Sequence, residues 1–208
     1  MNSTNPSRMV DERVWLTQYF ERYQASIFQT DVYEQLIELK DRFMQVQARG
    51  KKAILAGNGG SAAIASHCAV DFTKNAGIRC VNFNEADLIT CFANDYGYER
   101  WLEKALGFYA DEGDLIILIS SSGKSPNMVN AAHYAASRGL DVVTFTGFAE
   151  SNSLKACGVL NFWVKSRVYN VIEMTHHIWL LAVCDLLAGA EDTTQGLKAR
   201  PEPVRAKA

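Results

Sequence analysis

Two loops rich in glycine and serine contain the residues best suited to hold an anion. The first loop, Gly57 to Ser61 (Gly-Asn-Gly-Gly-Ser), follows a short apolar run and opens a helical segment. The second runs from Ser120 to Asn127 and also precedes a helix, with Ser125 as a suitable N-cap and Pro126 at the first helical position. Free backbone N–H groups at a helix N-terminus, with serine hydroxyls and Lys124 nearby, favour a phosphate site. The alternative is ordinary helix capping beside a flexible loop.

Neither loop has the spacing of a nucleotide-binding motif. The sequence contains no GxxxxGK followed by Ser or Thr, and the first loop does not fit GxGxxG. Hydrolysis of nucleoside triphosphates and hydride transfer are therefore disfavoured, and we expect no nucleotide cofactor.

Five short apolar runs alternate with helical patterns along most of the chain. The runs have the character of buried strands and lie at residues 53–57, 78–83, 114–120, 141–147 and 160–164. Helices are predicted over about 10–49, 61–75, 99–110, 125–139 and 170–187. Near-continuous apolar strands separated by helices indicate an α/β fold with a mostly parallel sheet covered on both faces. Ligands of such sheets bind at the carboxyl ends of the strands, so the loops after Ala56, Asn84 and Ile119 are the candidates for a site.

Composition and charge narrow the possible functions. The chain has 208 residues, and 21 Lys and Arg against 23 Asp and Glu give a net charge of −2, which does not indicate nucleic-acid or membrane binding. We expect one domain over residues 9–190, between a disordered end at 1–8 and a flexible tail at 191–208. The N-terminus lacks the apolar core of a signal peptide, and the longest apolar run, 178–184, is too short to span a bilayer. With five widely spaced cysteines typical of reduced thiols, these features favour a cytoplasmic location.

Three segments together resemble signatures of the SIS (sugar isomerase) domain family, in its phosphoheptose isomerase branch. They are GNGGSAAIASH from Gly57, ANDYGYE from Ala93 and ISSSGKSPN from Ile119. The resemblance implies a flavodoxin-like three-layer sandwich with a five-stranded parallel sheet and an N-terminal helical extension, assembled as a homotetramer with sites between subunits. It also implies the interconversion of sedoheptulose 7-phosphate and an aldoheptose 7-phosphate, often with bound zinc.

The same resemblance assigns residues to the substrate. The substrate's phosphate would be held by serines of the second loop, namely Ser120, Ser121, Ser122 and Ser125. The sugar would be contacted by residues of the first loop, of the ANDYGYE segment and of the last helix, namely Asn58, Gly59, Gly60, Ser61, Asn94, Asp95 and Glu173.

The chain departs from the branch at the catalytic positions. Where the branch has a His and a Glu four residues apart on the helix after the first loop, this chain has His67 and Asp71. Where the branch has a Gln and, eight residues later, a catalytic His on the last helix, this chain has Glu173 and Leu181. His177 shares the helix face of Glu173 and Leu181 and lies about 6 Å along the axis from the vacant position. If the two helices meet, they bring together two imidazoles and two carboxylates, those of His67, Asp71, Glu173 and His177. This set of ligands suits zinc or a similar divalent transition metal.

Plainer interpretations of these residues stay open. A carboxylate and a histidine four residues apart on a helix most often form a surface ion pair, and a metal-free site could lie at the same place. His176, three residues after Glu173, could equally be the histidine that faces inward.

The sequence as a whole predicts an isomerase of phosphorylated sugars that works through an enediol. Asp71 would be the base, and His177 or a metal ion would act at the carbonyl oxygen. The alternative is a SIS-type protein that binds a sugar phosphate or a protein partner without catalysis, because Leu181 stands where the branch has its catalytic histidine.

Overall fold

A parallel sheet with helices on both sides forms the body of the molecule. The computed structural model describes residues 11–189, so the expectations for residues 1–8 and 191–208 lie outside the described residues. The five strands pair in the order β2-β1-β3-β4-β5, every pair parallel. They are Ala53–Gly57 (β1), Cys80–Asn82 (β2), Leu115–Ser120 (β3), Asp141–Thr146 (β4) and Leu160–Trp163 (β5). The helices are Glu12–Ile27 (α1), Tyr33–Ala48 (α2), Gly60–Lys74 (α3), Ala86–Tyr96 (α4), Trp101–Tyr109 (α5), Pro126–Ser137 (α6) and Tyr169–Ala188 (α7), with 3-10 turns at Thr30–Val32 (η1) and Lys155–Cys157 (η2).

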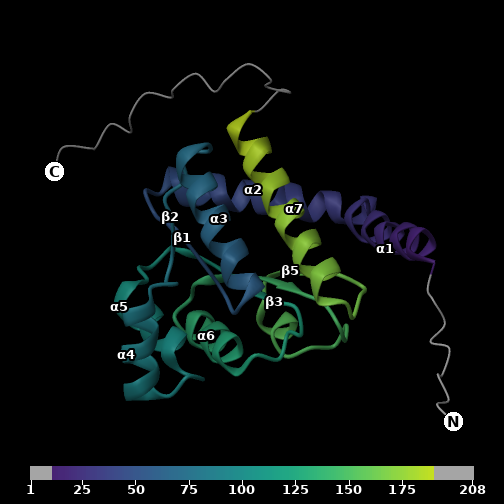
Figure 1. Cartoon of the computed structure of the whole chain (residues 1–208). Helices are drawn as coiled ribbons and strands as arrows, with labels where there is room; N and C mark the ends of the chain where they lie inside the picture. The colour runs from purple at the N-terminus through teal and green to yellow at the C-terminus, as the bar shows by residue number, and fades with distance from the viewer. Residues whose placement is uncertain (1–10, 190–208) are drawn as a thin grey trace, which may run out of the picture.

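The helices form two layers, one on each face of the sheet (Figure 1). Helices α2, α3 and α7 cover one face, and α4, α5 and α6 cover the other. Side chains along each strand alternate between the two cores: on β3, Ile117 packs in the first core, whereas Ile116 and Leu118 pack in the second. Burial on both faces explains why the strands read as continuous apolar runs. The predicted three-layer α/β sandwich with a five-stranded parallel sheet is confirmed.

The N-terminal helical segment is two helices rather than one. Helix α1 ends at Ile27 because Phe28 leaves the helical conformation and Gln29 is extended, and the turn η1 then leads into α2. The apolar side of α2 is buried against the sheet, with Leu39 and Phe43 fully buried. Helix α1 instead projects from the body of the molecule (Figure 1).

Helix α4 is the element that the sequence prediction missed, since it places a loop after Asn84. Its apolar residues Leu88, Ile89 and Phe92 recur at helical spacing and pack against the second core. The helix has only 11 residues and none of them is fully buried, so its pattern is weak.

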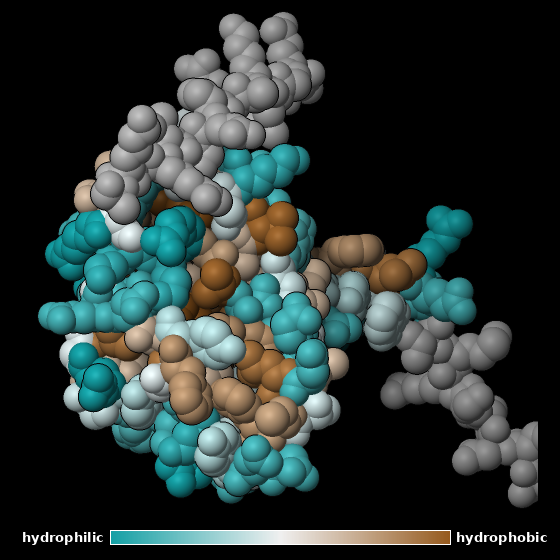
Figure 2. Space-filling view, turned by 90° about the vertical axis from the view of Figure 1, so that its left-hand side faces the viewer, coloured by the Kyte–Doolittle hydropathy of each residue, from teal (hydrophilic) through white to brown (hydrophobic). Residues whose placement is uncertain are grey.

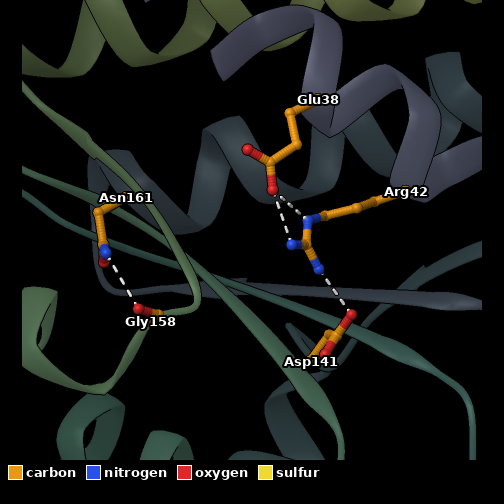
Figure 3. A network of polar contacts seen from close by, with 5 residues as sticks. All are labelled: Glu38, Arg42, Asp141, Gly158 and Asn161. Carbon is orange, nitrogen blue, oxygen red and sulfur yellow. Dashed lines mark hydrogen bonds and ion pairs between the residues drawn. The ribbon is translucent and has the colours of Figure 1, made fainter. Parts of the chain in front are cut away.

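A polar network ties helix α2 to the sheet at the end opposite to the glycine and serine loops. Arg42 lies 2.7 Å from Glu38, one turn earlier on α2, and 2.7 Å from Asp141 at the start of β4 (Figure 3). Nearby, the Asn161 amide donates to the Gly158 carbonyl over 3.0 Å. Partly exposed ion pairs contribute only about 0–1 kcal/mol each, so the network mainly fixes how α2 lies on the sheet.

Helix α7 is long and apolar enough, by length and composition alone, to cross a membrane, and no other helix within residues 11–189 is. The sequence-based expectation considered only unbroken apolar runs and did not anticipate this. Three side chains of α7, Ile172, Leu180 and Val183, are fully buried in the first core. We therefore assign α7 to the core of the sandwich.

Candidate active site

The two loops lie beside each other at the carboxyl edge of the sheet. The chain passes from β1 through α3 to β2 on one side of β1, and then returns to β3 on the other side. The direction of the strand order therefore reverses between β1 and β3. Open α/β sheets bind ligands in the crevice at such a reversal. The first loop follows β1 and the serine loop, Ser120–Ser125, follows β3, so the two loops flank this crevice.

The serine loop concentrates hydroxyl groups at the N-terminus of α6. Ser120 Oγ lies 3.1 Å from Ser125 Oγ, and the Lys124 backbone N–H donates to Ser122 Oγ over 3.3 Å. Ser121 Oγ is buried without a hydrogen-bond partner among the described residues. Ser125 occupies the N-cap position, but its side chain makes no capping hydrogen bond. Simple capping therefore does not account for these hydroxyls. Pro126 has no N–H and the Met128 N–H donates to the Ser125 carbonyl over 3.0 Å, so in the first turn of α6 the Asn127 N–H is the group left available to an anion among the described residues.

Gly123 and the segment after β4 hold the serine loop in shape. Gly123 has a φ of +63°, and a Cβ at this position would collide with the Asn152 side chain. The Leu154 N–H donates to the Gly123 carbonyl over 3.0 Å, while the Asn152 amide donates to Thr146 Oγ1 over 3.1 Å. The loop is thus fixed before any ligand binds.

We predict that Gly123→Ala destabilises the protein more than Gly139→Ala does. Both glycines have positive φ, at +63° and +72°, so alanine strains the backbone at either position by about 1–2 kcal/mol. Only Gly123 also faces a collision, because a Cβ at Gly139 would meet nothing within 4 Å. Urea unfolding of the two variants measures the difference. Equal losses of stability would show that Asn152 does not hold the loop.

The first loop is shaped by the close approach of α7. Gly59 has a φ of +55° and precedes α3, and a Cβ on Gly60 would collide with the Glu173 carboxylate. The Ser61 N–H donates to the Asn58 carbonyl over 3.0 Å, and Ser61 itself is buried. The structure therefore places Glu173 of α7 directly beside the first loop.

Helices α3 and α7 bring the candidate catalytic side chains together. His67 Nε2 lies 3.1 Å from Asp71 Oδ2 on α3, and the rings of His67 and His177 meet edge to face with centroids 4.7 Å apart. Glu173 lies one turn before His177 on α7. Leu181, one turn after it, packs against the first core. Two imidazoles and a carboxylate thus form a cluster at the α3–α7 contact, with Glu173 between this cluster and the first loop.

Burial shifts the pKa values of two side chains on α7, Glu173 and His177. Desolvation raises the pKa of Glu173 above its ordinary value. The pKa of His177 is lowered, first by desolvation and then by the positive charge of His67, against the opposing effect of Asp71. His177 Nε2 is buried and has no hydrogen-bond partner among the described residues. His177 is therefore neutral at neutral pH, and its buried Nε2 has hydrogen-bonding capacity that the described residues do not use.

His176, the neighbour of His177, faces the core instead. It is completely buried, its Nε2 lies 3.0 Å from the Thr146 carbonyl oxygen, and its ring packs near Phe145 and Trp179. Burial lowers the pKa of His176 to about 4, so this imidazole is neutral and structural. Of the two adjacent histidines, His177 is the one beside His67.

The described side chains do not form a metal site as they stand. Within residues 11–189, no group of three or more His, Cys, Asp or Glu side chains lies close enough together to hold a metal ion. The donor types of His67, Asp71, Glu173 and His177 suit zinc, but catalytic zinc needs three protein ligands at once. We therefore derive the chemistry from the protein's own groups.

The ANDYGYE segment contributes a residue that the sequence analysis did not select. Asn94 and Asp95 lie exposed on α4, where the Asn94 amide donates to Asp95 over 2.9 Å. Tyr98, just after α4, donates from its hydroxyl to Asn58 Oδ1 over 3.1 Å. Tyr98 lies within the ANDYGYE motif, whose Asn94 and Asp95 were expected at the site, and this position was the signal in the sequence that could have identified it.

Comparison with known proteins places the chain in a family. A model of the SIS domain matches residues 18–147, and the chain belongs to the SIS domain family. Its branch is that of the phosphoheptose isomerases, as the motifs predict. The chain is 38% identical to the phosphoheptose isomerase of Burkholderia pseudomallei over 146 residues, which cover 67% of this chain and 74% of that protein. It is 32% identical to the phosphoheptose isomerase of Nitratidesulfovibrio vulgaris over 165 residues, which cover 76% of this chain and 77% of that protein.

Solved structures agree with this placement. The phosphoheptose isomerase of Neisseria gonorrhoeae superimposes with a TM-score of 0.77 at 25% identity, covering 85% of this chain and 98% of that one. A phosphoheptose isomerase from Francisella tularensis, at 21% identity and a TM-score of 0.78, shows the same fold. The SIS domain match ends at residue 147, so α7 with Glu173 and His177 lies beyond it.

Proposed function

We propose that this protein interconverts sedoheptulose 7-phosphate and an aldoheptose 7-phosphate. Its phosphoheptose isomerase relatives support the substrate class. The observation that carries the catalytic proposal is the cluster of His67, Asp71 and His177 at the α3–α7 contact. A cytoplasmic location stays a prediction.

The proposed reaction moves one proton between adjacent carbons of the sugar. Asp71 removes the proton from the carbon next to the carbonyl group, and the neutral His177 donates its N–H proton to the carbonyl oxygen, which gives the enediol. The carboxylic acid of Asp71, which is partly exposed and can exchange its proton with solvent, then protonates the other carbon, and His177 recovers its proton from the other hydroxyl. His67, 3.1 Å from Asp71, orients the base. The serine loop holds the phosphate, so its binding energy aligns the reacting carbons with Asp71.

A second candidate function rests on Leu181. This side chain packs against the core and cannot transfer a proton, whereas the branch has its catalytic histidine at this position. A protein without a replacement for that histidine would bind a sugar phosphate and leave it unchanged.

A substrate panel tests the proposal. The protein is incubated with ketose and aldose phosphates of five to seven carbons, and the products are identified by NMR. We expect conversion of sedoheptulose 7-phosphate in preference to the shorter sugars. Tight binding of a sugar phosphate without any conversion would favour the second candidate.

Metal binding is a separate prediction. We propose that zinc or another divalent metal binds His67, Asp71, Glu173 and His177 once these side chains move closer together. Elemental analysis of protein purified without chelators is expected to find a stoichiometric divalent metal that His177→Ala reduces. Protein that contains no stoichiometric divalent metal and takes up none on dialysis against zinc would exclude this site.

We also propose that the protein is a homotetramer with sites between subunits. Helix α1 projects from the body of the molecule, and apolar surface is exposed on the projecting segment (Figures 1 and 2). Trp15 and Phe20 on this helix are exposed, and Phe28 just after it is 70% exposed. A largely apolar groove of about 830 Å³ lies between α2 and α7, with Tyr33 and Leu186 among its lining residues. Exposed apolar surfaces of this kind mark interfaces.

Light scattering tests the assembly directly. A tetramer has four times the 23.1 kDa mass of one chain. We expect this mass at micromolar concentration, and Phe20→Glu is expected to lower it because a charge would be buried in the interface. A monomer at that concentration would contradict both the tetramer and the shared site.

A further inference from the structure

The amide of Asn58 joins the three motifs of the sequence. Its Nδ2 donates to Asn127 Oδ1 over 3.0 Å, and its Oδ1 accepts from Asn127 Nδ2 over 2.9 Å. The Tyr98 hydroxyl donates to the same Oδ1 over 3.1 Å. Asn58 belongs to the first loop, Asn127 to the first turn of α6 after the serine loop, and Tyr98 to the ANDYGYE segment. One side chain thus connects all three segments beside the crevice.

The hydrogen-bonding capacity of this amide leaves one group unused. A carboxamide oxygen has two lone pairs, and its nitrogen has two N–H donors. Both lone pairs of Asn58 Oδ1 are occupied, by Tyr98 and Asn127, and one N–H donates to Asn127. The second N–H is the only group of this amide that these contacts leave free. In this arrangement Asn58 can donate to a ligand but cannot accept from it.

Both partners of Asn58 are themselves held in place. Asn127 is 1% exposed and lies next to Pro126, at the start of α6. Tyr98 is 55% exposed, but the segment that bears it is attached to α6, because the Asn130 amide donates to the Glu99 carbonyl over 2.9 Å. Rotation of the Asn58 amide would break hydrogen bonds to both partners at once.

We propose that Tyr98 and Asn127 are positioning residues: they hold the amide of Asn58, which the family resemblance already places at the sugar, so that its free N–H donates to an oxygen of the bound sugar phosphate. The ligand class is a phosphosugar that presents a carbonyl or hydroxyl oxygen as an acceptor to this N–H. The inference rests on the proposed function, because it needs a sugar phosphate in the crevice.

A double-mutant cycle tests whether Tyr98 acts through Asn58. Tyr98→Phe removes one exposed hydroxyl, and we expect it to lower kcat/KM for sedoheptulose 7-phosphate by about fivefold to tenfold with an unchanged thermal midpoint. In an Asn58→Ala background, Tyr98→Phe is expected to have no further effect, because the amide it positions is absent. Tyr109→Phe is the matched control, since Tyr109 is 51% exposed and its ring packs on Phe83; it is expected to leave kcat/KM unchanged.

Asn58→Asp provides a second variant that keeps the size of the side chain. It replaces the free N–H by a carboxylate oxygen, so we expect a loss at least as large as that of Asn58→Ala. Activity of Asn58→Asp equal to wild type would overturn the donor role.

The other outcomes separate this inference from the proposed function. If the wild type is active and Tyr98→Phe behaves like Tyr109→Phe, or acts equally in the Asn58→Ala background, the positioning role is wrong and the isomerase proposal stands. If the wild type binds the sugar phosphate without turnover, the isomerase proposal fails. The double-mutant cycle is then measured with dissociation constants, and Tyr98→Phe must still weaken binding in the wild type but not in the Asn58→Ala background. A wild type that neither binds nor converts a sugar phosphate refutes both.

Discussion

Asp71→Asn is expected to lower turnover of sedoheptulose 7-phosphate by about 1,000-fold or more, while the affinity for the sugar phosphate changes little. The amide keeps the shape of the side chain but cannot accept the proton from the carbon. Asp71 lies 3.1 Å from His67 and is partly exposed, so the substitution creates no buried cavity. Steady-state kinetics gives the loss of kcat, and calorimetry gives the affinity. Retained turnover in this variant would remove Asp71 as the base.

The adjacent histidines of α7 provide a matched pair for the same assay. His177→Ala is expected to lower kcat by about 100-fold, because the group beside the carbonyl oxygen is lost. His176→Ala removes a buried ring near Phe145 and Trp179, so it is expected to lower the thermal midpoint and to spare kcat of the folded fraction. If His176→Ala abolished turnover and His177→Ala did not, the assignment of the catalytic face of α7 would be wrong.

Replacing Ser120 and Ser122 together by alanine is expected to weaken binding of a phosphosugar by roughly 100-fold or more. Each hydroxyl that donates to a charged phosphate contributes about 1.5–3 kcal/mol. Among residues 11–189, the hydrogen bonds of these hydroxyls stay within their own loop, from Ser120 to Ser125 and from the Lys124 N–H to Ser122, so the thermal midpoint is expected to change little. Calorimetry with sedoheptulose 7-phosphate measures the change.

Ser137→Ala is the control for the serine-loop variant. Ser137 lies at the other end of α6 and donates to the Tyr134 carbonyl over 2.7 Å, so its loss is expected to leave the affinity unchanged. If the Ser120 and Ser122 double variant bound the phosphosugar as tightly as this control, the anion would bind elsewhere.

The sequence was sufficient to predict the layers of the fold because burial on both faces leaves a strong pattern. The strand 115–120 begins with five consecutive apolar residues that could hardly be exposed, and Leu39 and Phe43 mark the buried side of α2. The pattern failed where packing is weak. Helix α4 has no fully buried residue, and the break at Phe28 depends on local conformation rather than on a change of hydrophobicity.

The candidate site was predictable where helical spacing alone decides which residues share a face. His67 with Asp71, and Glu173 with His177, are such pairs. Spacing could not decide between His176 and His177, since that choice depends on how α7 rotates against the sheet, and the Thr146 carbonyl fixes it. Nor could spacing reveal Tyr98, because its contact with Asn58 joins residues 40 apart in the sequence.

Proton exchange with solvent tests the central claim, which is that this cluster forms an enediol. Wild-type protein is incubated with sedoheptulose 7-phosphate in deuterated water, and NMR follows the hydrogens on the carbons next to the carbonyl group. Asp71 is partly exposed, so the proton that it holds can exchange with the solvent before it is returned. Deuterium is expected at the carbon that receives the proton in the aldose product and, after reversal, at the carbon of the ketose from which Asp71 removed it, and neither label is expected with Asp71→Asn. If the wild type binds the sugar phosphate but gives neither deuterium incorporation nor product, the protein forms no enediol and the isomerase proposal is contradicted.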